Sequence, residues 1–367
     1  MPKPKLNFIK LDLKDPFKFK KGETLSEIEL AYHTFGTINQ KKDNVILVCH
    51  ALTMDSQCGS YGEEVEEEEG WWDFMVGANK PIDTNRFHII CINVLGGCKG
   101  STGPTTINPD TKKAYGPDFP QVTINDMVRT QNMLLEQLGI NHLHAVIGGS
   151  LGGMQALEWS ILFPNKLDKC IAIATGARLS TQGLAFDIVG RQCILNDPDW
   201  HSESNEKDEQ RITGLALARM IGHITYISKK MMDEKFGRKL QKGWKDSGFN
   251  TAFAIESFLK YQSEKFVKRF DATSYLYLTK AMDSYDMASG FESLADSLTR
   301  VQCKFLIISL SSDWLFPPDD SIDLAWSLSN QGKEATYANI QTNLGHDAFL
   351  IDIEEMKPMK NIVKAFL

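Results

Sequence analysis

A serine surrounded by glycines is the first residue of this chain whose setting could support chemistry. Ser150 lies in VIGGSLGGMQALEW, and Gly148, Ser150 and Gly152 match the pattern G-x-S-x-G. In that pattern a strand turns sharply into a helix and exposes a nucleophilic serine, and glycines at the two outer positions avoid collisions with the turn. For Gly149 and Gly153 we expect close packing of the strand against the helix. The pattern alone is weak, because chance produces it in roughly one chain in ten of this length.

A serine hydroxyl is a poor nucleophile near neutral pH, so it needs a general base and an acid that orients the base. His346, in LGHDAFL, is the only histidine after position 223 and follows the last apolar run. Asp313 lies three residues beyond another apolar run, FLIISL, and before a Pro-Pro turn. We therefore predict a catalytic triad of Ser150, Asp313 and His346, in the chain order that α/β-hydrolase sheets use.

A tetrahedral intermediate on the serine would need hydrogen-bond donors for its oxyanion. One is expected to be the backbone N–H of Leu151, directly after the nucleophile, and the other should come from the loop after an early strand. The segment CHALTMDS has that position, with Leu52 as the expected donor. His50 lies in the same segment, and we expect it to shape this loop, because His346 fits the triad order better as the base.

Short apolar runs rich in β-branched residues alternate with helical segments, which is the pattern of a mostly parallel sheet with helices on both faces. Strands are predicted at residues 44–50, 87–94, 143–149, 169–175, 304–310 and 335–340. The segment 123–139 opens with a Thr-x-x-Asp signal, carries apolar residues at helical spacing and ends at a glycine, so we predict a helix there. Ser150 at a sharp strand-to-helix turn, called a nucleophile elbow, adds to this pattern. Together, these elements predict an α/β chain of the α/β-hydrolase fold.

The strand pattern disappears between Arg178 and about Thr299, where the sequence becomes helical and amphipathic. We predict a catalytic core formed by residues 1–177 and 300–367, with residues 178–299 as an inserted all-helical lid over the carboxyl edge of the sheet. The Met, Phe and Tyr residues of this insertion could line a substrate tunnel or a dimer face, although most of them are expected to be core.

The overall charge excludes some partners. The chain of 367 residues has a net charge of -7 and a pI near 5.7, which gives no general attraction to nucleic acid or to an anionic membrane. No apolar run approaches the roughly 18 residues needed to span a bilayer, and the lysine-rich start lacks a signal-peptide pattern, so we expect no membrane association. Six glutamates at residues 63–69 indicate a solvated loop without a catalytic role.

The cysteines indicate the redox environment. There are seven of them, scattered and without a C-x-x-C pair, and most lie in apolar strands such as VILVCH and FHIICIN. This distribution predicts reduced core thiols in a cytoplasmic protein, with neither a disulfide framework nor a zinc site.

Longer segments carry a resemblance to a known family. They are CHALT, GWWDFMVGANKPIDTNRFHIICINVLGGCKGSTGPTTINP, GGSLGGMQALEW, RQCILNDPDW, GLALARMIGHITY, KRFDATSYLYLTKAMD, SSDWLFPP and GHDAFL. In this order, from about residue 30 to residue 352, they resemble homoserine O-acyltransferases of the MetX type. The resemblance implies an α/β-hydrolase fold, a helical lid that forms a deep tunnel and the contact of a homodimer, and acyl transfer from acyl-CoA to the hydroxyl of L-homoserine in methionine biosynthesis.

The resemblance also implies substrate-binding residues. Arg219, in LARMIGHITY, would match the arginine that grips the amino acid, and Asp347 would match the aspartate that binds its ammonium group. An arginine fork suits a carboxylate and an aspartate suits an amine, so the pair fits a zwitterion. Tyr226, one helical face along from Arg219, is a weaker candidate for lining the tunnel. The implied mechanism is ping-pong through an acyl-serine, with acyl-CoA as co-substrate and with no cofactor or metal; exclusion of water separates it from hydrolysis.

The acyl group is harder to assign. Succinyl-using relatives often carry a basic residue two positions after the triad aspartate, where this chain has Leu315, so we expect acetyl-CoA. The acceptor is also open, because close relatives acylate serine. Two segments depart from the family: HSESNEKDEQR replaces a glycine- and tyrosine-containing stretch, and the acidic run replaces one that commonly contains Gly and Pro. Both could affect the entry of acyl-CoA.

Other functions remain open at this level. An esterase-like hydrolase of the same fold would use water as the acceptor, but a simple ester needs no clamp for a zwitterion. A binding protein that kept the fold and lost the chemistry would have no reason to retain the serine, its partners and the oxyanion loop.

Overall fold

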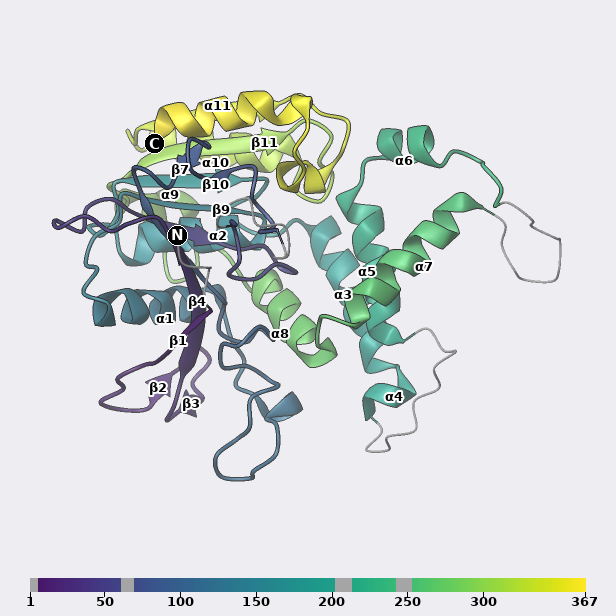
Figure 1. The fold of residues 1–367 in the computed structure, drawn as a ribbon, viewed down its shortest axis with the longest axis horizontal. Helices are drawn as coiled ribbons and strands as arrows, with labels where there is room; N and C mark the ends of the chain where they lie inside the picture. Colours follow the sequence, from purple (N-terminus) through teal and green to yellow (C-terminus); the bar gives the residue numbers. More distant parts are fainter. Residues whose placement is uncertain (1–5, 61–68, 202–212, 242–252) are drawn as a thin grey trace.

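An eight-stranded sheet lies at the centre of the computed structural model, which describes residues 6–60, 69–201, 213–241 and 253–367 (Figure 1). Neighbouring strands are parallel from β8 to β12, whereas β4 is antiparallel to both β1 and β8. In order across the sheet, the strands are β1 (Asn7–Lys10), β4 (Glu29–Phe35), β8 (His88–Ile92), β5 (Val45–Cys49), β9 (Ala145–Gly149), β10 (Lys169–Ile173), β11 (Lys304–Leu310) and β12 (Ala335–Ile340). The predicted, mostly parallel sheet is therefore confirmed.

The six predicted strands are the six parallel ones, and the antiparallel pair β1 and β4 was missed. These two strands carry a weaker signal, because NFIK is short and ELAYHTF mixes polar with apolar residues. β10 ends at Ile173, two residues before the predicted end, because Ala174 has a φ of 47° and turns the chain out of the sheet. Two further small sheets pair β2 (Phe17–Lys18) with β3 (Thr24–Leu25) and β6 (Val76–Gly77) with β7 (Ile82–Asp83).

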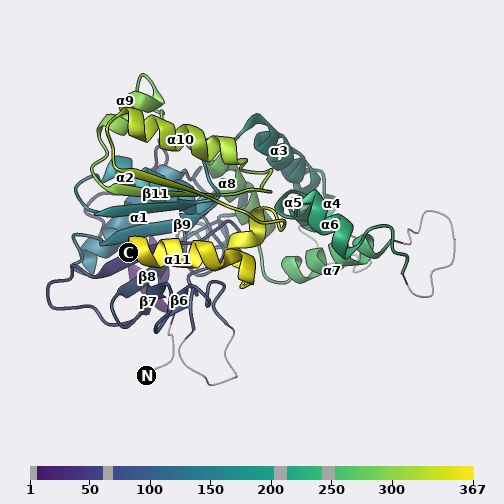
Figure 2. The same ribbon diagram turned by 90° about the horizontal axis from the view of Figure 1, so that it is seen from above.

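Helices cover both faces of the sheet, as predicted. α1 (Ile124–Gln137), α2 (Leu151–Leu162) and α10 (Pro318–Asn330) pack on one face, and α11 (Lys357–Phe366) packs on the other (Figure 2). Alternate residues of β5 enter the two cores, Leu47 on the first face and Ile46 and Val48 on the second. Because both faces are buried, the central strands read as continuous apolar runs.

The start of α1 follows the sequence signal closely. Thr123 is the N-cap, and its side chain and that of Asp126 form a reciprocal capping box that satisfies two backbone N–H groups at the start of the helix. At the other end, Gly139 follows with a φ of 70°, a conformation that favours glycine. The predicted helix is therefore confirmed.

Between β10 and β11 the chain forms a group of helices beyond the carboxyl ends of the strands, on the right in Figure 1. In the described part of this segment no strand is assigned. The helices are α3 (Thr181–Leu195), α4 (Pro198–His201), α5 (Gly214–Tyr226), α6 (Lys229–Lys235), α7 (Ala254–Val267) and α8 (Ala272–Asp283). A further helix, α9 (Leu294–Thr299), lies beside α10 (Figure 2). The division at residues 178 and 299, and the action of these helices as a lid, remain predictions.

Three short 3-10 helices complete the elements: η1 (Gly116–Asp118), η2 (His346–Leu350) and η3 (Glu354–Met356). All seven cysteines are free, and five of them are buried. Among the helices that the structure describes, none has the length and apolar character required to cross a membrane. The acidic run lies outside the described residues except for Glu69, as does HSESNEKDEQR except for its first residue.

Candidate active site

Ser150 lies at the turn between β9 and α2, with a φ of 56° and a ψ of -123°. This positive φ is strained for a residue that has a side chain, and it is the conformation expected of an elbow nucleophile. A Cβ on Gly148 would come within 2.3 Å of the Gly152 backbone, and a Cβ on Gly152 within 2.1 Å of the Cys49 carbonyl oxygen. Close backbone contacts therefore require glycine at both positions, as predicted.

The prediction for Gly149 was wrong. A Cβ there would come within 2.4 Å of the Phe349 ring, so this glycine makes room for a side chain of η2 and not for helix packing. The Phe349 ring in turn packs edge-on against the His346 ring, with 5.7 Å between centroids. Gly153 does face the end of a strand, because its Cβ would meet the side chain of Thr175, just beyond β10. Gly149 thus helps to position the histidine from the elbow side.

Asp313 and His346 form a buried pair, although 33 positions separate them in the chain. His346 Nδ1 lies 2.6 Å from Asp313 Oδ2, and the other carboxylate oxygen accepts the backbone N–H groups of Leu315 and Phe316, both at 3.0 Å. The Phe316 ring stacks on the imidazole at 5.4 Å. The aspartate is therefore held by its own loop, and it fixes the orientation of the histidine ring.

The electrostatic setting of His346 follows from this pair. Burial lowers the pKa of the imidazole, but the negative charge of Asp313, the hydrogen bond to it and the charge of Asp347 together raise it further, so the pKa lies above its ordinary value. Because a neighbouring carboxylate stabilises its protonated form, this imidazole is suited to take up a proton from the serine.

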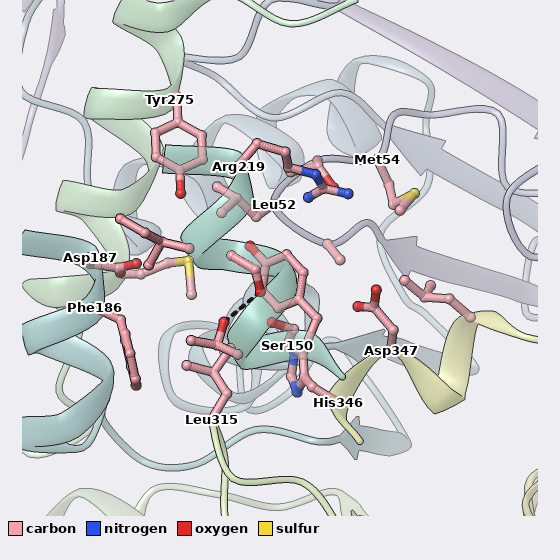
Figure 3. A pocket seen from close by; sticks show the side chains of 18 of the residues that line it. Leu52, Met54, Ser150, Phe186, Asp187, Arg219, Tyr275, Leu315, His346 and Asp347 are labelled. Carbon is pink, nitrogen blue, oxygen red and sulfur yellow. Dashed lines mark hydrogen bonds between the residues drawn. The ribbon is translucent and has the colours of Figure 1, made fainter. Parts of the chain in front are cut away.

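Ser150 and His346 line one cavity at the carboxyl end of the sheet, beneath the inserted helices (Figure 3). The cavity encloses about 700 Å³, counting the space open to solvent. Both side chains are shielded, with the serine 5% and the histidine 3% exposed. The arrangement suits attack by the serine on a substrate bound in this cavity, with the histidine as base.

The two residues predicted to donate to the oxyanion, Leu151 and Leu52, lie next to the serine and in the loop after β5. Leu151 is the first residue of α2, where backbone N–H groups have no acceptor within the helix, and Leu52 lines the cavity from the loop after β5. Among the hydrogen bonds of the described residues, none uses either N–H. His50 holds this loop: its Nδ1 donates to the Ala51 carbonyl at 2.9 Å, and its Nε2 accepts the Val94 N–H at 3.1 Å.

Arg219, on α5, brings a positive charge into the cavity. Its guanidinium carbon lies 4.7 Å from the centre of the Phe266 ring and 5.3 Å from that of Tyr226. Its Nε and Nη1 are buried and have no hydrogen-bond partner among the described residues. A buried donor without a partner is costly, so these two N–H groups are available to a ligand in the cavity, while the aromatic rings hold the guanidinium in place.

The remaining predicted residues also line this cavity. Asp347 follows the histidine and opposes the positive charge of Arg219; burial raises the pKa of its carboxyl, and Arg219 and His346 partly offset that rise. Burial also raises the pKa of the Tyr226 hydroxyl to about 12, so the tyrosine stays neutral. Leu315 contributes an apolar wall. Of the predicted site residues, only Leu151 and Asp313 do not line the cavity: Leu151 lies next to the serine, and Asp313 is bonded to the histidine ring.

Among the lining residues that the sequence analysis missed are two with ionisable side chains. Asp187 on α3 and Tyr275 on α8 both face the cavity. In the sequence each is one polar group on an amphipathic helix, and no spacing links either of them to the triad. No group of three or more His, Cys, Asp or Glu suited to a metal ion occurs in the part of the chain that the structure describes.

The nucleophile elbow, the parallel sheet and the Ser-Asp-His order define a hydrolase-type fold. Comparison with known protein families gives the same class. A family model described as alpha/beta hydrolase fold matches residues 44–350, so the chain belongs to this family. A homoserine O-acetyltransferase of Methanohalobium evestigatum is 49% identical over 341 residues, which make up 93% of this chain and 69% of that protein. The crystal structure of homoserine O-acetyltransferase from Bacillus anthracis is 28% identical, with a TM-score of 0.91 over 100% of this chain and 98% of that one. Within the family, the chain belongs to the homoserine O-acetyltransferases.

Other similar proteins carry different names. A homoserine O-succinyltransferase of Alkalilimnicola ehrlichii is 45% identical over 360 residues, covering 97% of this chain and 92% of that protein. The structure of esterase E22 has a TM-score of 0.88 and is 27% identical, covering 99% of both chains. The names of similar proteins therefore include transfer of another acyl group and ester hydrolysis.

Proposed function

We propose that this protein transfers the acetyl group of acetyl-CoA to the hydroxyl of L-homoserine, through an acyl-enzyme on Ser150. One observation carries the proposal: the cavity that holds Ser150 and His346 also holds the guanidinium of Arg219, two of whose nitrogens have no hydrogen-bond partner among the described residues, and the carboxyl group of Asp347. A serine triad by itself supports many acyl transfers. A cation and an anion in the same cavity suit the carboxylate and the ammonium of an amino acid.

In the first half-reaction, His346 takes the proton from Ser150 Oγ, which attacks the thioester carbonyl. The backbone N–H groups of Leu52 and Leu151 stabilise the oxyanion. The C–S bond then breaks, and CoA leaves as the thiol with the proton from His346. Asp313 keeps the imidazole in the required tautomer and stabilises its protonated form. The products are free CoA and acetyl-Ser150.

In the second half-reaction, homoserine replaces CoA, with its carboxylate on Arg219 and its ammonium on Asp347. His346 removes the proton of the homoserine hydroxyl, whose oxygen attacks the acyl-serine. The ester bond to Ser150 Oγ breaks, and the serine recovers its proton from His346. The low exposure of both residues limits attack by water, which favours transfer over hydrolysis. Neither half-reaction as written requires a cofactor or a metal ion.

The experiment that tests this function pairs two donors with three acceptors. CoA release is measured with acetyl-CoA or succinyl-CoA and with homoserine, serine or water alone. We expect acetyl-CoA with homoserine to have the highest kcat/KM, because Leu315 offers no cation for a succinyl carboxylate. A higher rate with water alone would make the protein an esterase-like hydrolase. Faster turnover with serine or with succinyl-CoA would change the assigned acceptor or donor. No CoA release at all would indicate a binding protein.

The same assay, applied to Arg219→Lys, tests whether Arg219 binds the carboxylate of homoserine. A lysine loses the planar fork and the stacking on both rings, so we expect KM for homoserine to rise by about 10- to 100-fold while acetylation of Ser150 is unchanged. Arg300→Lys is the matched control, since this exposed arginine packs on Phe291 outside the cavity. Slower acetylation with an unaltered KM for homoserine would contradict the role of Arg219.

We also infer a homodimer formed through the inserted helices, in a cytoplasmic enzyme. Large apolar side chains are exposed on α3 and α5, which pack against each other. They are Ile188, Val189, Leu195, Leu217 and Ile224. Exposed large apolar side chains on two helices that pack together are typical of a protein interface.

Size-exclusion chromatography with light scattering tests the dimer. We expect a dimer for the unaltered protein and a monomer for Ile188→Asp with Leu217→Asp, because a buried charge would lose its hydration in the interface. Trp326→Asp is the control, since this exposed side chain lies on α10 and not on α3 or α5. A monomeric parent protein, or a variant that remains dimeric, would overturn the proposed interface.

A further inference from the structure

The loop that carries Leu52 is a closed turn. The N–H of Met54 donates to the Ala51 carbonyl at 3.0 Å. Leu52 and Thr53 are therefore the two central residues of a four-residue turn. On the side of the sheet, His50 Nδ1 holds this turn through the Ala51 carbonyl, at 2.9 Å. The peptide groups of a closed turn move together, so a second contact at Thr53 would fix the direction of the Leu52 N–H.

Arg269 makes that second contact from the inserted helices. It lies in the short connection between α7 and α8, and its Nη1 donates to the Thr53 carbonyl at 2.9 Å. The two residues are 216 positions apart in the chain, so the bond joins the insertion to the loop after β5. Thr53 lines the cavity and Arg269 does not. The arginine can therefore act on the site through this loop.

Phe266 holds Arg269 in place, although the arginine itself is exposed. The Arg269 backbone N–H donates to the Phe266 carbonyl at 3.0 Å, and its guanidinium carbon lies 5.5 Å from the centre of the Phe266 ring. A guanidinium within about 6 Å of an aromatic ring is attracted to it. The same ring, only 1% exposed, also supports Arg219, which Figure 3 shows on the same side of Ser150 as Leu52. One buried ring thus contacts both the arginine that faces the cavity and the arginine that holds the loop.

We propose that Arg269 is a positioning residue for acyl transfer: by holding the Thr53 carbonyl, it keeps the Leu52 N–H directed at the oxyanion. This inference rests on the proposed acyl-enzyme and its oxyanion donors, though not on the identity of the acceptor. A donor stabilises the oxyanion only at hydrogen-bond distance from it, and loss of one such donor costs about 10²- to 10³-fold in kcat. A loop held from the side of the sheet alone keeps part of that stabilisation. The inserted helices therefore contribute to the chemical step as well as covering the cavity.

The test compares two variants of Arg269 with the parent protein. Arg269→Met removes the donor but keeps a long side chain beside Phe266, and Arg269→Lys keeps a donor and the positive charge. Arg238→Met is the matched control, since this exposed arginine of the inserted segment lies 4.9 Å from the Phe253 ring and does not line the cavity. Intact-mass spectrometry follows acetylation of Ser150 by acetyl-CoA with no acceptor present. Each rate is the time constant of adduct formation, so a fraction of unfolded protein lowers the amplitude and not the rate.

A second measurement, inhibition by trifluoroacetone, reports on the oxyanion itself. Ser150 Oγ adds to the ketone carbonyl, its proton passes to His346, and the electron pair of the C=O π bond stays on the oxygen as an oxyanion. The adduct has no leaving group, so it does not react further. Its inhibition constant therefore depends on the oxyanion donors, whereas KM for acetyl-CoA includes binding of the unreacted thioester.

In Arg269→Met we expect the acetylation rate to fall about tenfold and the inhibition constant of trifluoroacetone to rise by a similar factor. KM for homoserine should change by less than about twofold, because Phe266 still supports Arg219. Arg269→Lys should recover most of both losses, because its ammonium can donate to the Thr53 carbonyl. Arg238→Met should match the parent protein in every measurement.

The outcomes separate this inference from the proposed function. An unchanged acetylation rate in Arg269→Met overturns the role of Arg269, as does a slower rate with an unchanged inhibition constant. Equal losses in Arg269→Met and Arg269→Lys also overturn it, because the lysine retains a donor. A normal acetyl adduct without transfer to homoserine would overturn only the assigned acceptor. Absence of any adduct on Ser150 in the parent protein would overturn the acyl-enzyme and this inference together.

Discussion

Ser150→Ala is expected to lower kcat for CoA release by about 10⁶-fold, the order of loss seen when the nucleophile of a serine triad is removed. Without Oγ no acyl-enzyme can form, and the remaining groups can only polarise a bound thioester. The alanine keeps the Cβ and therefore the positive φ of the elbow, so the turn is neither relieved nor further strained. We expect the melting temperature to stay within a few degrees of that of the parent protein. Steady-state CoA release and intact-mass spectrometry measure the effect.

Ser160→Ala is the matched control for this loss. Ser160 is buried on the same helix, α2, and its hydroxyl donates to the Leu157 carbonyl at 2.6 Å, outside the cavity. Its removal should cost about 1 kcal/mol of unfolding free energy and leave the acylation rate unchanged. Comparable activity in both variants, or an acyl adduct on Ser150→Ala, would show that the nucleophile is a different residue.

The core of the fold could be predicted because the burial of its strands is visible in short stretches of sequence. The parallel strands are buried on both faces, so each appears as a short apolar run bounded by turns. The antiparallel strands β1 and β4 could not be recognised in this way, because β1 is short and β4 mixes polar with apolar residues. The capping box of Thr123 and Asp126 is likewise a local interaction, and it was readable from four consecutive residues.

The site was predictable to the extent that its groups follow strand ends. Asp313 and His346 each come after a parallel strand, and the carboxyl ends of such strands meet at one edge of the sheet, which brings them together across 33 positions. The rule that functional groups follow the ends of parallel strands does not identify Arg219 and Asp347 as site residues. Only the family resemblance indicated these two residues. Asp187 had neither signal, because nothing in the order of residues along α3 tells which side of a helix faces a cavity formed by other helices.

The Gly149 prediction shows where backbone reasoning reaches its limit. Glycine is required at positions 148 and 152 because backbone atoms of the turn and of the neighbouring strand leave no room for a Cβ. The pattern G-x-S-x-G encodes this requirement. Glycine is required at position 149 because a Cβ there would collide with the Phe349 ring, 200 positions away. The position of that ring depends on the whole C-terminal segment. A distant side chain of this kind leaves no trace in the residues around the serine.

Asp313→Asn is expected to lower kcat by about 10⁴-fold and to change the pH profile of the remaining activity. The carboxylate accepts one hydrogen bond from His346 Nδ1–H and two from backbone N–H groups of its own loop. An asparagine has one oxygen for these donors, and turning its NH₂ toward the imidazole favours the wrong tautomer. In that tautomer, Nε2 of His346 carries the proton, so it offers Ser150 an N–H group and not the lone pair that a general base needs.

The direction of the pH effect follows from the pKa of His346. Only the neutral imidazole can accept the serine proton, so activity of the parent protein should fall as the pH drops through a pKa above the ordinary value of 6.5. Removing the charge of Asp313 leaves burial to lower that pKa, so the acid limb of kcat/KM should move to lower pH in Asp313→Asn. Asp319→Asn removes an equal charge from an exposed position in the first turn of α10 and should leave the limb in place. An acid limb that moves equally in both variants would mean that long-range charge, and not the direct bond to Asp313, sets the protonation of the base.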